Sequence, residues 1–154
     1  MTAVKIEYLY LDLTTCDRCV GTDAVLERTI EILRPALETA GYDIHYEKKE
    51  IYSAEIAENY RLLSSPTIRV NGADIFEILR ESNCGCCGNI AGTDIDCRVV
   101  EWKGKEYEVP TEAVLADAIL TSIFAPRQPQ NDEYSFPENL RRFFEGKKRL
   151  LRMA

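Results

Sequence analysis

Hydrophobic and polar positions in the first part of the chain change from a strand pattern to a helix pattern. Residues 4–13 carry β-branched, aromatic and aliphatic side chains on both faces, which is typical of a strand buried in the middle of a sheet. From residue 24 onwards, leucine and isoleucine recur every three or four positions, which indicates an amphipathic helix. We expect this helix to begin after Cys19, with Thr22 or Asp23 as its N-cap.

The segments that follow predict a strand, a short helix and a hairpin. Residues 42–51 alternate between apolar and polar side chains, as a half-buried strand does, and Ser53 can cap a helix after it. Residues 67–70 form a short β-branched run. Asn71-Gly72 is a strong hairpin-turn signal, so residues 73–77 should return antiparallel to that run.

A second hairpin and an apolar helix complete the predicted elements before residue 126. The hairpin turns at Lys103-Gly104, and Thr111 can cap the helix. The overall order is strand, helix, strand, helix, strand, strand, helix. It predicts an α/β fold in which a βαβ unit joins a ββα unit around a mixed central sheet, with helices on both faces.

Length and composition favour one globular domain with extensions. The chain has 154 residues, of which 45% are hydrophobic and 29% charged, so it can bury a substantial core without metal or disulfides. We expect residues 1–126 to form the domain, with residues 78–98 as a cysteine-rich insertion. Residues 127–154 are predicted to form a linker and a basic amphipathic segment.

Charge and hydropathy exclude several classes of partner. The net charge of -7 argues against a nucleic-acid binder, because phosphates would be repelled over most of the surface. No apolar run approaches the length of about 20 residues that a membrane-spanning helix needs, so membrane binding is not expected. The first residues lack the layout of a signal peptide, and a reducing cytoplasm is therefore the expected location.

The basic segment at the end of the chain has a helical apolar face. Phe143 and Phe144 lie on it, and we expect them to pack on the chain's own domain or on a second copy in a homodimer. The alternative is that the segment docks on a membrane surface or on another protein.

Two motifs in the first half of the chain indicate a family. Cys16-Asp17-Arg18-Cys19 follows the first predicted strand, and Ser65-Pro66-Thr67 precedes the third. In this arrangement the chain resembles the thioredoxin/glutaredoxin superfamily, and we expect it to belong to one of the functionally uncharacterised families of that superfamily. The resemblance implies a thioredoxin-like fold over residues 4–77 and the later helix. It also implies that Pro66 is cis and lies against the cysteine pair.

The cysteine pair predicts thiol-disulfide exchange without a cofactor. Two intervening residues let the sulfurs of Cys16 and Cys19 reach bonding distance, with Cys16 as the nucleophile and Cys19 as the resolving thiol. Arg18 can supply the positive potential that a thiolate needs. Pro66 holds the chain extended, so the backbone of Thr67 could pair with a bound partner. The expected partner is a protein or small-molecule disulfide or thiol.

Topology should bring four further cysteines to the same site. The hairpin returns the chain to the edge of the sheet where Cys16 and Cys19 lie, so the cysteine-rich segment should cover that edge. These cysteines could relay oxidising equivalents from the pair. Alternatively, four of the six thiolates could hold zinc, copper(I), or another thiophilic metal or metalloid. A purely structural insertion, stapled by its own disulfide or zinc, is the third interpretation. The six candidate ligands are Cys16, Cys19, Cys84, Cys86, Cys87 and Cys97.

Overall fold

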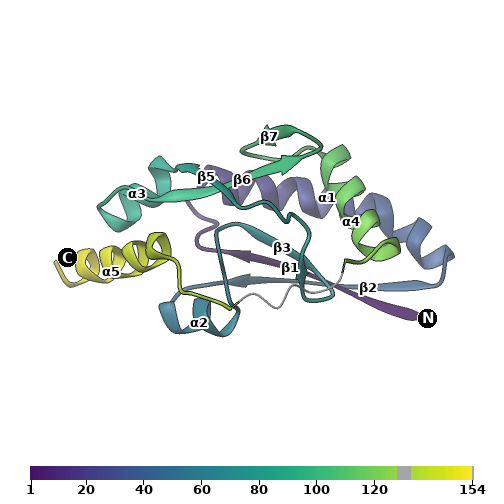
Figure 1. Ribbon diagram of the computed structural model, residues 1–154, viewed down its shortest axis with the longest axis horizontal. Coiled ribbons are helices and arrows are strands. Elements are labelled where there is room, and N and C mark those ends of the chain that lie inside the picture. The colour runs from purple at the N-terminus through teal and green to yellow at the C-terminus, as the bar shows by residue number, and fades with distance from the viewer. Residues whose placement is uncertain (128–132, 154) are drawn as a thin grey trace.

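The protein is an α/β structure with two sheets, a larger one of mixed strand direction and a smaller antiparallel one. The computed structural model describes residues 1–127 and 133–153 (Figure 1). In the larger sheet the strand order is β2-β1-β3-β4, with β1 parallel to β2 and antiparallel to β3. In the smaller sheet β6 lies between β5 and β7. The described strands are β1 (Thr2–Tyr10), β2 (Tyr42–Glu50), β3 (Thr67–Val70), β4 (Ala73–Asp74), β5 (Arg80–Asn83), β6 (Asp96–Trp102) and β7 (Lys105–Tyr107).

The helices lie on both sides of the larger sheet. Helices α1 and α4 pack on each other over one face, and α2 lies on the opposite side (Figure 1). Helix α5 runs beside α3, at the end of the molecule from which strand β6 starts. Their bounds are α1 (Asp17–Thr39), α2 (Ala54–Asn59), α3 (Gly85–Ala91), α4 (Glu112–Phe124) and α5 (Glu138–Met153).

Two hydrophobic clusters hold these layers together. The first lies between the larger sheet and helices α1 and α4, and includes Ile6, Leu26 and Leu115, each 0% exposed. The second contains the buried cysteines and the apolar face of α5. The candidate site therefore lies inside a packed core, where side chains have little freedom to move.

The start of α1 differs from the sequence-based prediction. The helix begins at Asp17 with Cys16 as its N-cap, and the prediction of Thr22 or Asp23 as the cap is wrong. The carboxylate of Asp12 accepts hydrogen bonds from the backbone N–H groups of Thr15 and Cys16, which holds the turn before the helix. Polar residues in the first turns of α1 are buried, so they extend its inward face although they interrupt the hydrophobic pattern.

The cysteine-rich segment is also more ordered than its composition indicates. The sequence predicts a glycine-rich loop over the cysteine pair, whereas the structure contains strand β5, helix α3 and strand β6 in succession. Gly92 ends α3 in the left-handed region, with φ 71, which few residues other than glycine adopt readily. Residues 78–98 thus contribute strand β5 and the start of strand β6 to a second sheet.

The C-terminal segment packs on its own chain. Leu140 and Phe143 are 0% exposed and Phe144 is buried, so the expected packing of the two phenylalanines occurs within one molecule. The side chain of Asn139 pairs with both the backbone N–H and the carbonyl of Asp96, at 2.8 and 2.7 Å. The predicted linker includes residues 128–132, which lie outside the described residues.

We predict that Gly146→Ala destabilises the protein, although this change normally favours a helix. A Cβ at position 146 would overlap the carbonyl oxygen of Ala91 in α3, so one helix would have to shift. The expected loss is about 1–3 kcal/mol in the free energy of unfolding, measured by urea denaturation. Gly85→Ala, where a Cβ meets no atom within 4 Å, is the matched control. Equal stability of the two variants would contradict the close packing of α5 on α3.

Candidate functional site

Four buried thiols converge at the junction of α1, α3 and β6. Their Sγ atoms all lie within 4.8 Å of one another. The Sγ atoms of Cys16 and Cys84 are 3.8 Å apart, and those of Cys87 and Cys97 are 3.4 Å apart. We call this group the four-cysteine cluster; its members are Cys16, Cys84, Cys87 and Cys97.

Regular secondary structure fixes each member of the four-cysteine cluster. Cys16 and Cys84 are the N-caps of α1 and α3, and Cys87 lies in the first turn of α3. Cys97 is the second residue of β6, opposite Ser82 of β5. The backbone N–H of Cys84 donates to the carbonyl of Ile95 at 2.8 Å, which ties the start of α3 to the strand that carries Cys97. The expected meeting of the cysteine-rich segment with Cys16 is confirmed.

The spacing of the four sulfurs is compatible with a tetrahedral metal site. Zinc–thiolate bonds of about 2.3 Å place neighbouring sulfurs of a tetrahedron about 3.8 Å apart. The Cys16–Cys84 and Cys87–Cys97 pairs, at 3.8 and 3.4 Å, lie close to that edge length, and the remaining pairs are no farther than 4.8 Å. Closing the group around an ion would therefore need only small side-chain adjustments.

Crowding favours the thiolate form of Cys16 and disfavours that of Cys87 and Cys97. Hydrogen bonds from Cys19, Cys87 and Cys97 lower the pKa of the Cys16 thiol far below its ordinary range. Because they donate to Cys16, and because burial disfavours their charged forms, the pKa values of Cys87 and Cys97 are raised. Of these three thiols, Cys16 is therefore the one whose negatively charged form is favoured.

The other two cysteines lie outside the four-cysteine cluster. Cys19 is in the first turn of α1, is 0% exposed, and its Sγ lies 3.5 Å from Oγ of Ser65. Its interaction with Cys16, together with burial, raises the pKa of the Cys19 thiol. Cys86 is half-buried on α3. The structure therefore brings four of the six candidate ligands together.

The proline motif lies next to the cysteine pair and is paired within the chain. The Ser65–Pro66 peptide is cis, as the resemblance implies. The carbonyl of Ser65 accepts the backbone N–H of Arg98 from β6 at 2.7 Å, and Thr67 is 1% exposed. A strand of the same chain, β6, therefore pairs with the backbone beside Pro66. Binding of a partner by Pro66 and Thr67 stays a prediction.

Comparison with known proteins places the chain in a family. Residues 4–119 match the family described as a domain of unknown function, DUF2703. The chain belongs to the DUF2703 family. Its matched region contains all six cysteines and ends before α5. No curated protein and no solved structure matches the chain. Among the described residues of this DUF2703 protein, no helix is both long and apolar enough to span a membrane.

Arg18 connects the cysteine pair of this DUF2703 protein to the cysteine-rich segment. It is 7% exposed, and its guanidinium donates to the carbonyls of Ser82 and Cys97 at 3.0 and 2.8 Å and to that of Asn83 at 2.8 Å. Glu108 provides a further partner at 3.3 Å. The sequence indicated Arg18 only as a source of charge. Its role as a clamp depends on residues more than 60 positions away, which no local pattern reveals.

We predict that Arg18→Met lowers the free energy of unfolding by about 3 kcal/mol, because three carbonyl groups lose a charged donor in a buried setting. Arg28→Met removes an exposed ion pair with Glu112 from the same helix and is the control, with an expected loss below about 1 kcal/mol. Urea denaturation of both variants measures the difference. Similar losses would show that Arg18 is not a clamp.

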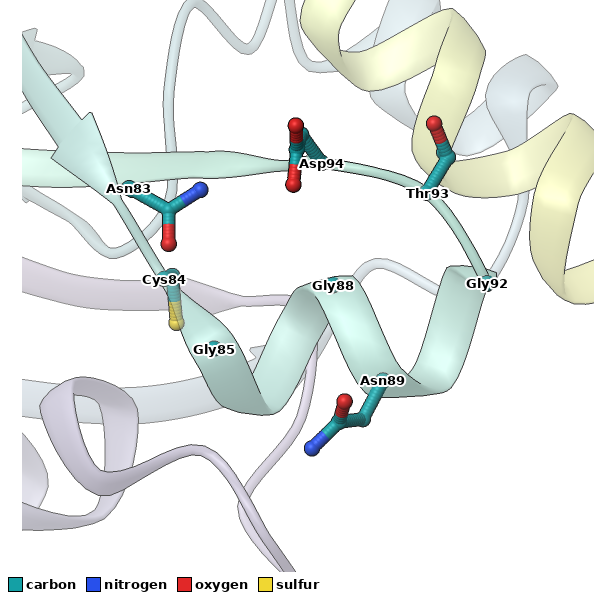
Figure 2. Close-up of a pocket in the computed structure, with 8 residues that line it drawn as sticks. All are labelled: Asn83, Cys84, Gly85, Gly88, Asn89, Gly92, Thr93 and Asp94. Atoms are coloured by element: carbon teal, nitrogen blue, oxygen red, sulfur yellow. The ribbon is translucent and has the colours of Figure 1, made fainter.

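A polar cleft borders the four-cysteine cluster of the DUF2703 protein. It measures about 580 Å³ and lies between α3 and the segment that returns to β6 (Figure 2). Gly85, Gly88 and Gly92 lie along its helical side, and Asn83 and Asp94 along the other. Among the described residues, Cys84 is the cluster member that lines this cleft. Cys84 is 5% exposed, whereas the other three members are 0% exposed, so solvent reaches the cluster at Cys84.

Proposed function

We propose that the protein binds a thiophilic metal ion, with zinc as the leading candidate, through the four-cysteine cluster. The observation that carries the proposal is the convergence of four buried Sγ atoms within 4.8 Å of one another. Four thiolates in a tetrahedral arrangement are a preferred ligand set for zinc or iron. Copper(I) and heavy-metal ions share the preference for sulfur and are the next candidates.

Charge supports a metal ion over four unliganded thiols. A divalent cation would let Cys87 and Cys97 ionise beside Cys16, which their raised pKa values otherwise oppose. Four thiolates around a divalent ion leave a net charge of −2. The buried guanidinium of Arg18, bonded to the carbonyl of Cys97, offsets part of it. Because protein sulfurs would fill all four positions, the site would hold its metal and leave no open position for a substrate.

The proposal is tested by metal analysis of protein produced without added metal. We expect native mass spectrometry and elemental analysis to find one tightly held zinc or related ion per chain. Protein recovered without metal should take up one equivalent of zinc under reducing conditions, with loss of four titratable thiols. Absence of metal together with failure to take up zinc would overturn the proposal.

Thiol-disulfide exchange in a thioredoxin-like fold is the second candidate. The strand order β2-β1-β3-β4, with β1 parallel to β2 and antiparallel to β3, supports the resemblance stated for the two motifs. The position of Cys16 as N-cap of the long helix α1 favours its thiolate, since the helix N-terminus is electropositive. A protein or small-molecule disulfide would be the substrate, and the reduced thiols suit a cytoplasmic location.

Exchange is separated from metal binding by assays on metal-free, reduced protein. The exchange function predicts that Cys16→Ser abolishes reduction of a model disulfide and that Cys19→Ser accumulates a mixed disulfide on Cys16. If both variants reduce the model disulfide at the rate of the unmodified protein, this candidate function is wrong. The result has no bearing on whether the four-cysteine cluster takes up zinc.

A further inference from the structure

We propose that Cys19 makes metal binding sensitive to peroxide: oxidation joins Cys16 to Cys19 in a disulfide, removes one ligand and releases the metal. The inference rests on the proposed metal site. Its basis is that Cys16 belongs both to the four-cysteine cluster and to the C-x-x-C pair with Cys19. Cys16 cannot bind the metal as a thiolate while it is part of a disulfide, so the two states exclude each other.

Cys19 is placed to form this disulfide without taking a second ligand from the metal. It follows Cys16 by three positions in the first turn of α1, where the N–H of Val20 donates to the carbonyl of Cys16 at 2.9 Å. Two intervening residues allow a disulfide across such a turn. The Sγ of Cys19 faces Oγ of Ser65 at 3.5 Å, a neutral neighbour. Cys19 is not a member of the four-cysteine cluster, so its reaction with oxidised Cys16 takes no further ligand from the metal.

The chemistry needs one two-electron oxidant of small size, because both thiols are 0% exposed. Hydrogen peroxide transfers one oxygen to the Cys16 thiolate, giving a sulfenic acid and, after protonation, one water. The Cys19 sulfur then attacks Cys16 Sγ, the S–O bond breaks, and the hydroxyl leaves with the Cys19 proton as a second water. The thiol pair loses two electrons, and peroxide is reduced to two water molecules.

Loss of Cys16 leaves three thiolates that cannot complete a tetrahedron. Cys84, Cys87 and Cys97 remain as possible ligands. Three sulfurs bind the ion more weakly than four, and the metal dissociates. A dithiol reductant that restores the Cys16 and Cys19 thiols should restore metal binding.

The test compares zinc-loaded unmodified protein with the Cys19→Ser and Cys86→Ser variants in a small molar excess of hydrogen peroxide. A chromogenic zinc indicator follows release, and peptide mapping identifies the disulfides. All three proteins should begin with one zinc per chain, since neither substitution removes a ligand of the cluster. We expect the unmodified protein and Cys86→Ser to release zinc together with a Cys16–Cys19 disulfide. Release from Cys19→Ser should be about tenfold slower.

Zinc release from Cys19→Ser at the unmodified rate would overturn the inference. A Cys16–Cys84 or Cys87–Cys97 disulfide with Cys19 still reduced would overturn it as well. Cys19→Ala, loaded and treated in the same way, keeps the test valid if the serine variant fails to fold. If the unmodified protein holds no zinc at the start, the proposed metal site is wrong and the inference fails with it. That outcome is separate from zinc binding that is insensitive to Cys19.

Discussion

Cys97→Ser should weaken zinc binding by about a hundredfold or more while the protein remains folded. The binding free energy of a structural zinc site is about 10–16 kcal/mol, which corresponds to about 3 kcal/mol for each of four ligands. Cys97 is 0% exposed, and its Sγ lies 3.4 Å from that of Cys87, so its hydroxyl replacement would occupy the same position with a poorer ligand. Competition with a chelator of known affinity measures the change.

Cys86→Ser is the matched control for Cys97→Ser. Cys86 lies on α3 next to a cluster member, but it is half-buried and outside the group of converging sulfurs. We expect the zinc affinity of Cys86→Ser to equal that of the unmodified protein. If both substitutions weaken binding equally, the ion is not held by the cluster that the structure assembles.

Removal of the metal should lower the melting temperature by about 10 °C. A ligand present at about a thousand times its dissociation constant adds about 4 kcal/mol to the free energy of unfolding. Each kcal/mol raises the melting temperature of a domain of this size by about 2–4 °C. The bound ion would join the start of α1 to α3 and β6, which are otherwise linked through Arg18 and the second hydrophobic cluster. Thermal unfolding with and without a strong chelator measures the effect.

The metal-dependent part of this stability should decrease as the pH falls. In the metal-free protein Cys87 and Cys97 keep their protons, because their pKa values lie above the ordinary thiol value of 9.0. Metal binding must displace those protons, so acid opposes it and higher pH favours it. The difference between the melting temperatures of metal-loaded and metal-free protein should therefore shrink between about pH 8 and pH 6. A constant difference over that range would contradict thiolate ligation.

Much of the fold follows from local pattern. The alternation of strands and helices over residues 4–77 and the Asn71-Gly72 turn correspond to elements β1 to β4 of the structure. The direction of the hairpin was sufficient to place the cysteine-rich segment near Cys16, because a returning strand must come back to the edge from which its partner began. The position of the cysteine-rich segment was thus predicted from the strand topology, because no residue pattern indicates it.

The selection of ligands could not be read from composition. Cys84 and Cys87 share one side of α3 because they are three residues apart, and this spacing is a signal once the segment is known to be helical. The glycines of the cysteine-rich segment instead indicated a loop. The early start of α1 was hidden for a related reason. Arg18 and Thr22 are polar, but they are buried and continue the inward face of the helix.

Zinc K-edge X-ray absorption on the metal-loaded protein tests the central claim most directly. A site built by the four-cysteine cluster predicts a first shell of four sulfur atoms at about 2.3 Å and no nitrogen or oxygen ligand. A first shell that contains nitrogen or oxygen, or fewer than four sulfurs, would contradict the proposed site.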